Sequence, residues 1–135
     1  MFEYHVNVKI HEIDAAGIMF FANYFKFAHD AFEEFCEAGG LEIKKMLDHA
    51  PYILPVVHAS MDFKAPVFAG DKLKVRLIFE SVGSSSFTIL HEIYKEYEVL
   101  AATGKIIHVS IDRNTGEKIP VPEEILKLLN SKGSI

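Results

Sequence analysis

The sequence has only one cysteine, Cys36, and no tryptophan among its 135 residues. A single cysteine excludes an internal disulfide framework and any zinc site that is built on several thiolates. Basic residues are also a minority, 14 against 19 acidic residues, and the formal net charge is −5 at pH 7. This balance argues against nucleic-acid binding driven by overall charge, so we expect no nucleic-acid partner.

Long apolar runs are missing too. No segment approaches the roughly 20 consecutive apolar residues that a membrane-spanning helix needs. The alternating N-terminus, MFEYHVNVKI, lacks the apolar core of a signal peptide. Half of the residues are nevertheless hydrophobic and 24% are charged, which is a globular composition. We therefore predict one domain over residues 1–135, with no membrane partner and a cytoplasmic location.

Several well-known catalytic motifs are absent from the sequence. It has no GxSxG nucleophile elbow, no glycine-rich phosphate loop, no HExxH and no dinucleotide fingerprint. The seven histidines show no compact metal-ligand spacing, so we expect no metal site. Cys36 adjoins an apolar helical stripe, and we interpret it as a small core thiol.

Alternation of apolar and polar residues predicts five strands. The first strand covers the N-terminal segment and buries the face that carries Phe2, Tyr4, Val6, Val8 and Ile10. The other four strands are predicted over residues 57–64, 72–79, 87–96 and 100–112. Short connections between sequential strands favour an antiparallel sheet.

A helical period interrupts the alternation after the first strand. Apolar residues recur every three or four positions from Tyr24 to Phe35, with Asn23 as the expected N-cap and Gly39-Gly40 as the stop signal. The wide aromatic stripe predicts a helix inside the fold, with a sheet around it. A closing helix is expected over residues 123–129. One long helix packed on an antiparallel sheet is an α+β domain.

The segment from Asp14 to Tyr24, between strand and helix, carries the candidate chemistry. The carboxylate of Asp14 lies in a loop that leads to a helix start, where unpaired backbone N–H groups favour anions. Such donors can stabilise the oxyanion of acyl transfer, and a carboxylate beside them can act as nucleophile or general base. The alternative is that Asp14 only caps a turn, because DxxG is a common loop pattern.

The same segment resembles the active-site signature of the 4-hydroxybenzoyl-CoA thioesterase family of hotdog-fold enzymes. The matching positions are Asp14, Ala16, Gly17, Phe21, Asn23 and Tyr24. Residues 55–71 and 82–87 extend the resemblance, which covers about residues 2–126. It implies a hotdog fold, in which a five-stranded antiparallel sheet wraps around one long helix. It also implies homodimers or homotetramers with active sites at the subunit interfaces.

The resemblance implies roles for individual residues. Asp14 matches the catalytic carboxylate, the backbone N–H of Phe21 matches the donor to the thioester carbonyl, and Gly17 lets the backbone approach the ligand. Tyr24 and the run Ser84-Ser85-Ser86 are candidate substrate contacts, with a polar turn as the alternative for the serines. Phe21 stands where one branch of the family has a histidine.

The activity that the resemblance implies is hydrolysis of an acyl-CoA thioester without metal or cofactor. The runs FFAN (residues 20–23) and AHDAFE (residues 28–33) are also similar to thioesterases that act on 1,4-dihydroxy-2-naphthoyl-CoA. The residues do not decide whether the acyl group is aromatic or aliphatic, or whether its carrier is CoA or an acyl carrier protein. They also leave open whether Asp14 acts as nucleophile or as general base. Two other functions stay open: a hotdog hydratase or dehydratase, for which His11 and His29 are poorly placed, and a non-catalytic acyl-binding module.

Overall fold

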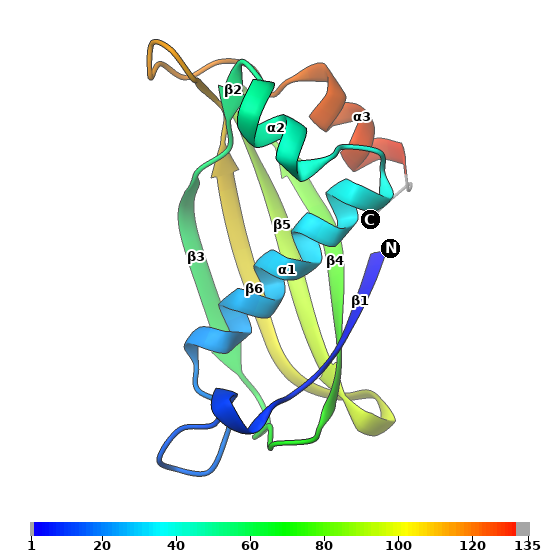
Figure 1. The fold of residues 1–135 in the computed structure, drawn as a ribbon. Coiled ribbons are helices and arrows are strands. Elements are labelled where there is room, and N and C mark those ends of the chain that lie inside the picture. Colours follow the sequence, from blue (N-terminus) through cyan, green and yellow to red (C-terminus); the bar gives the residue numbers. More distant parts are fainter. Residues whose placement is uncertain (1, 132–135) are drawn as a thin grey trace.

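A five-stranded antiparallel sheet organises the computed structural model, which describes residues 2–131 (Figure 1). The strand order is β1-β4-β5-β6-β3, so that β1 and β3 form the two edges. The strands are β1 (Phe2–Asn7), β3 (Val56–Phe63), β4 (Lys72–Val82), β5 (Ser86–Lys95) and β6 (Val99–Val109). The sheet curves around the helix α1 (Ala22–Ala38), which crosses one of its faces (Figure 1). The predicted α+β architecture is confirmed.

The helix α1 packs on the sheet through residues that repeat every three or four positions. Those that are buried are Tyr24, Phe27, Ala28, Ala31, Phe32, Phe35 and Cys36. Burial raises the pKa of the Cys36 thiol to about 12, as expected for an inert core thiol. Asn23 as N-cap is wrong, because the helix already begins at Ala22 and Phe21 holds the cap position with helical dihedral angles.

The first strand is shorter than the alternation predicted. Val8 is buried, but Ile10 is 84% exposed and begins a 3₁₀ turn, η1 (Ile10–Glu12). The turn forms because the Lys9 N–H donates to the Glu12 carboxylate at 2.7 Å and the Glu12 N–H donates to the Lys9 carbonyl at 3.0 Å. The chain thus curls away from the sheet, and Ile10 does not join the buried face.

Short elements cover the far end of the sheet, opposite the loop that precedes α1 (Figure 1). They are α2 (Ile43–His49), β2 (Tyr52–Ile53), which pairs with β7 (Ile111–Asp112), and α3 (Glu123–Ser131). Ile125 and Leu129 of α3 are fully buried, and the Tyr52 hydroxyl donates to Glu124. A second 3₁₀ turn, η2 (Glu96–Glu98), joins β5 to β6. No helix between residues 2 and 131 has the length and apolarity to cross a membrane.

Candidate active site

The loop that carries Asp14 is a small, self-bonded turn. Two backbone hydrogen bonds close it: the Asp14 N–H donates to the Ile18 carbonyl at 2.9 Å, and the Gly17 N–H donates to the Asp14 carbonyl at 3.0 Å. Gly17 adopts φ +84°, a left-handed conformation that glycine takes without strain. The Ala16 N–H donates to Oδ1 of Asp14 at 2.8 Å. One carboxylate oxygen therefore orders the turn, and Oδ2 accepts no hydrogen bond from residues 2–131.

The start of α1 leaves two backbone N–H groups without an acceptor among residues 2–131. The N–H groups of Asn23 and Tyr24 donate to the carbonyls of Phe20 and Phe21, at 2.9 and 3.2 Å. Those of Phe21 and Ala22 donate to no protein acceptor in the described part of the chain. Phe21 has helical dihedral angles, φ −57° and ψ −31°, so its N–H belongs to the set that leaves a helix N-terminus unpaired. These donors can bind an anion or a polarised carbonyl oxygen.

A pocket of about 380 Å³ joins the carboxylate to the helix start. Asp14, Phe21 and Tyr24 line it together with Phe63 and Lys64 at the end of β3. The rings of Tyr24 and Phe63 meet edge to face with centroids 4.8 Å apart. The pocket residues therefore combine a carboxylate with an unused oxygen, the helix-start residue Phe21 with its unpaired N–H, and aromatic side chains.

The electrostatics of the pocket keep the Tyr24 hydroxyl protonated. Burial raises the pKa of Tyr24, and the negative charge of Asp14 raises it further. A neutral phenol beside a carboxylate can donate a hydrogen bond to it or to a bound ligand. Tyr24 thus lies where a substrate contact is expected, although the contact itself stays a prediction.

The three serines lie elsewhere in the protomer. Ser84 and Ser85 belong to the turn between β4 and β5, and Ser86 begins β5, whereas the loop that precedes α1 and carries Asp14 lies at the opposite end of the sheet (Figure 1). The 11 residues of β4 separate these ends, which at roughly 3.3 Å per residue amounts to about 35 Å. Within one protomer the structure gathers Asp14, Gly17, Phe21 and Tyr24 and leaves the serines apart.

Neither candidate histidine lines the pocket. His11 is exposed in η1, and Nδ1 of His29 lies 3.4 Å from Oε1 of Glu33 on α1. Among the pocket residues, sequence reasoning missed Phe63, Ala65 and Pro66. No local motif marks them, because they reach the pocket only through the position of β3 at the sheet edge.

Comparison with known proteins finds thioesterases, both by sequence and by structure. The family model of the thioesterase-like superfamily matches residues 8–129. A 1,4-dihydroxy-2-naphthoyl-CoA hydrolase from Nostoc punctiforme is 37% identical over 130 residues, which cover 96% of this chain and 87% of the relative. The crystal structure of a 1,4-dihydroxy-2-naphthoyl-CoA thioesterase from Synechocystis aligns with a TM-score of 0.89 and 29% identity, covering 95% of this chain and 94% of that one.

A second solved structure is that of a gentisyl-coenzyme A thioesterase. It aligns with a TM-score of 0.83 and 28% identity, covering 92% of this chain and 98% of the other. The family-model match spans the loop that holds Asp14, the helix α1 and the strands β3 to β6. The chain therefore belongs to the thioesterase-like superfamily and has its hotdog fold.

Proposed function

We propose that this protein hydrolyses the thioester of an aromatic acyl-CoA, with 1,4-dihydroxy-2-naphthoyl-CoA as the first candidate, in the pocket at the start of α1. The protein is an acyl-CoA thioester hydrolase, as its family and the names of its relatives show. One observation carries the assignment of the site. Asp14, whose Oδ2 accepts no hydrogen bond from residues 2–131, and Phe21, whose N–H has no acceptor among them, line the same pocket.

The proposed reaction begins when the thioester carbonyl binds at the Phe21 N–H. One such oxyanion donor typically lowers the barrier by about 3–4 kcal/mol. In one route Oδ2 of Asp14 attacks the carbonyl carbon, the C–S bond breaks, and water then hydrolyses the mixed anhydride. In the other route Asp14 takes a proton from the water that attacks. Both routes release CoA and the free acid, and the thiolate leaves without a strong general acid.

The aromatic wall of the pocket supports the substrate class. Phe21, Tyr24 and Phe63 line a volume of about 380 Å³, which falls in the range of small-molecule sites. Offset or edge-to-face contacts between rings add to the burial of apolar area. The relatives described above are named for naphthoyl and gentisyl thioesters, both of which are aromatic.

We also propose that the active enzyme is a homodimer or a homotetramer built from such dimers. The edge strand β3 is exposed along most of its length, and Val57 and Phe63 are 62% and 51% exposed. An unpaired edge with apolar side chains needs a cover, and a second copy would supply it. Antiparallel pairing through β3 would bring the far end of the second sheet, which carries the serine turn, toward this pocket. Ser84, Ser85 and Ser86 therefore stay proposed substrate contacts, made across subunits.

The test is release of free thiol from a panel of acyl-CoA thioesters. The panel contains 1,4-dihydroxy-2-naphthoyl-CoA, 4-hydroxybenzoyl-CoA, butyryl-CoA and octanoyl-CoA. We expect the aromatic thioesters to give the higher kcat/KM. Asp14→Asn should lower kcat about a thousandfold or more, while its side-chain oxygen can still accept the Ala16 N–H and preserve the turn.

Asp112→Asn is the matched control. Oδ1 of Asp112 accepts the N–H groups of Asn114 and Thr115, at 2.8 and 2.9 Å, in a turn beyond β7. Because this turn lies outside the pocket, Asp112→Asn should leave kcat unchanged. Full turnover of Asp14→Asn would overturn the proposed site. A clear preference for the aliphatic thioesters would overturn the substrate class, and addition of water to an enoyl-CoA without release of CoA would favour a hydratase.

A further inference from the structure

One backbone carbonyl connects the Asp14 turn to the helix start. The carbonyl of Glu12 accepts the Phe20 N–H at 2.9 Å and also Nδ2–H of Asn23 at 3.0 Å. Glu12 lies two positions before Asp14, and Phe20 lies one position before Phe21. The two hydrogen bonds therefore join the segment that carries the carboxylate to the segment that carries the free N–H groups.

Glu12 itself is firmly held. Its side chain is only 4% exposed, and its carboxylate accepts the Lys9 N–H at 2.7 Å and Nζ of Lys26 at 3.3 Å. A buried carboxylate with a main-chain donor and an ammonium partner has little freedom to move. The Glu12 carbonyl is thus a fixed point beside a helix start that has no side-chain cap of its own.

We propose that Asn23 is a positioning residue for thioester hydrolysis, because its Nδ2–H ties the first turn of α1 to the Glu12 carbonyl and thereby sets the Phe21 N–H against Asp14. This inference rests on the proposed function of the pocket. A helix without a capping side chain frays at its first turn, where the free donors lie. Small displacements of a donor from the reacting carbonyl reduce the rate strongly, since the oxyanion is stabilised only at short range.

The side chains of Asn23 and Lys26 allow a matched comparison. Both bond to Glu12 from the same helix, but Asn23 bonds to the carbonyl and Lys26 to the carboxylate. Asn23→Ala should lower kcat about tenfold and leave KM within a factor of about two, because Asn23 lines no part of the pocket. Lys26→Ala should lower kcat much less, because both bonds to the Glu12 carbonyl and the Lys9 N–H bond to the Glu12 carboxylate remain.

The measurement is kcat and KM for the best thioester of the panel, at a temperature far below thermal unfolding of each variant. Asn23→Leu repeats the test with the side-chain volume kept, in case Asn23→Ala does not fold. A kcat that is unchanged in the Asn23 variants, or lowered equally in Lys26→Ala, would overturn the positioning role. Full turnover of Asp14→Asn would instead overturn the proposed function, so the two failures are distinguishable.

Discussion

The two ends of α1 differ in how their backbone groups are used. At the end of the helix the Gly39 N–H donates to the carbonyls of Phe35 and Cys36, both at 3.1 Å, and the Leu41 N–H donates to Cys36 at 2.9 Å. A Cβ placed on Gly39 would lie 1.9 Å from Cδ1 of Leu128, so α3 packs directly against this end. At the start, the N–H groups of Phe21 and Ala22 have no acceptor among residues 2–131, and Phe21 lines a pocket.

The difference indicates that one end of α1 stabilises the fold and the other end takes part in the reaction. Every helix leaves unpaired N–H groups at its start and unpaired carbonyls at its end. Here the chain satisfies the end of α1 with its own backbone and covers it with α3, whereas the start is left for a ligand. We call the C-terminal end of α1 with α3 the closed end, and the N-terminal end of α1 with the Asp14 loop the open end. Substitutions at the closed end should change stability, and substitutions at the open end should change turnover.

The largest expected effect on stability comes from Leu129→Ala at the closed end. Leu129 of α3 is fully buried in the core. Its truncation leaves a cavity and should lower the free energy of unfolding by about 3 kcal/mol. Urea denaturation measures the loss. Leu126→Ala, on the half-buried face of the same helix, should lose only about 1 kcal/mol. A kcat per folded enzyme that falls with stability would show that the two ends are not independent.

Most of the sheet and the helix could be predicted from local sequence, because both rest on periodic burial. The five main strands and α1 follow the alternating and the three-to-four-residue patterns. The β2–β7 pair was missed because each strand has two residues and the pairing joins positions 52–53 to 111–112. No local period marks such a contact, which depends on tertiary packing alone.

The candidate site could be predicted only where its residues are neighbours in sequence. Asp14, Phe21 and Tyr24 fall within one loop and one helical turn, so a motif contains them. Phe63 and Lys64 come from a distant strand end, and the pocket wall they form depends on the strand order. The bond between Asn23 and the Glu12 carbonyl was also missed, because a capping residue and a tertiary donor look alike in sequence.

The core between the two ends should respond to acid. His91 is buried beside Ala28, and neither of its ring nitrogens has a hydrogen-bond partner among residues 2–131. Burial lowers the pKa of His91 to about 4, and the nearby His108 lowers it further. The unfolded chain takes up this proton near pH 6.5. The folded state is therefore fully stabilised above that pH and loses stability as the pH falls toward 4.

Preferential protonation of His91 in the unfolded chain should lower the free energy of unfolding by about 2 kcal/mol between pH 7 and pH 5. Urea denaturation at each pH measures the change. The control is His91→Leu, which removes the titrating ring from a buried position and should flatten the pH dependence. His108 keeps part of the slope, because burial lowers its pKa too. If His91→Leu retains the full slope, acid acts at another place, and the open end becomes the first region to test.

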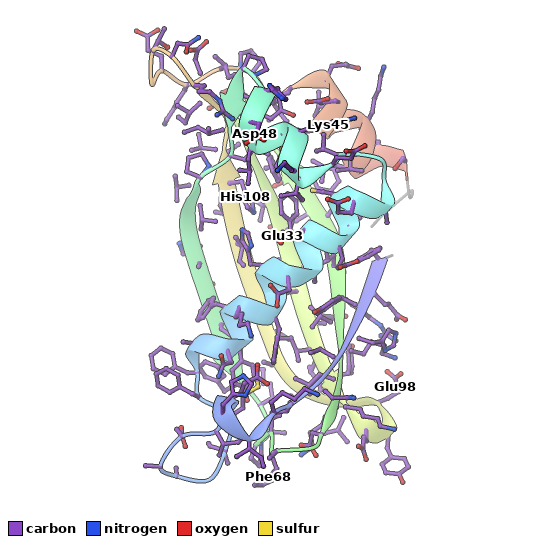
Figure 2. All side chains as sticks on the ribbon, viewed as in Figure 1. Glu33, Lys45, Asp48, Phe68, Glu98 and His108 are labelled. Carbon is purple, nitrogen blue, oxygen red and sulfur yellow. The ribbon has the colours of Figure 1, made fainter. Side chains whose placement is uncertain are left out.

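The smallest expected effect tests strain at the open end itself. The hairpin between β5 and β6 lies at this end of the sheet, and Glu98 marks it in Figure 2. Tyr97 and Glu98 have φ +63° and +58°, a left-handed conformation that non-glycine side chains adopt with strain. Tyr97 is 96% exposed, so Tyr97→Asn should gain about 0.5 kcal/mol in the free energy of unfolding.

Glu98→Asn is the matched control for this turn. It relieves similar strain but removes the ion pairs of Glu98 with Lys74 and Arg76, so its gain should be smaller. Both variants should keep the kcat of the parent enzyme, because the turn lies outside the pocket. A slower Tyr97→Asn enzyme would mean that the strain in this hairpin serves catalysis. The open end would then extend from the Asp14 loop across the sheet to the β5–β6 turn.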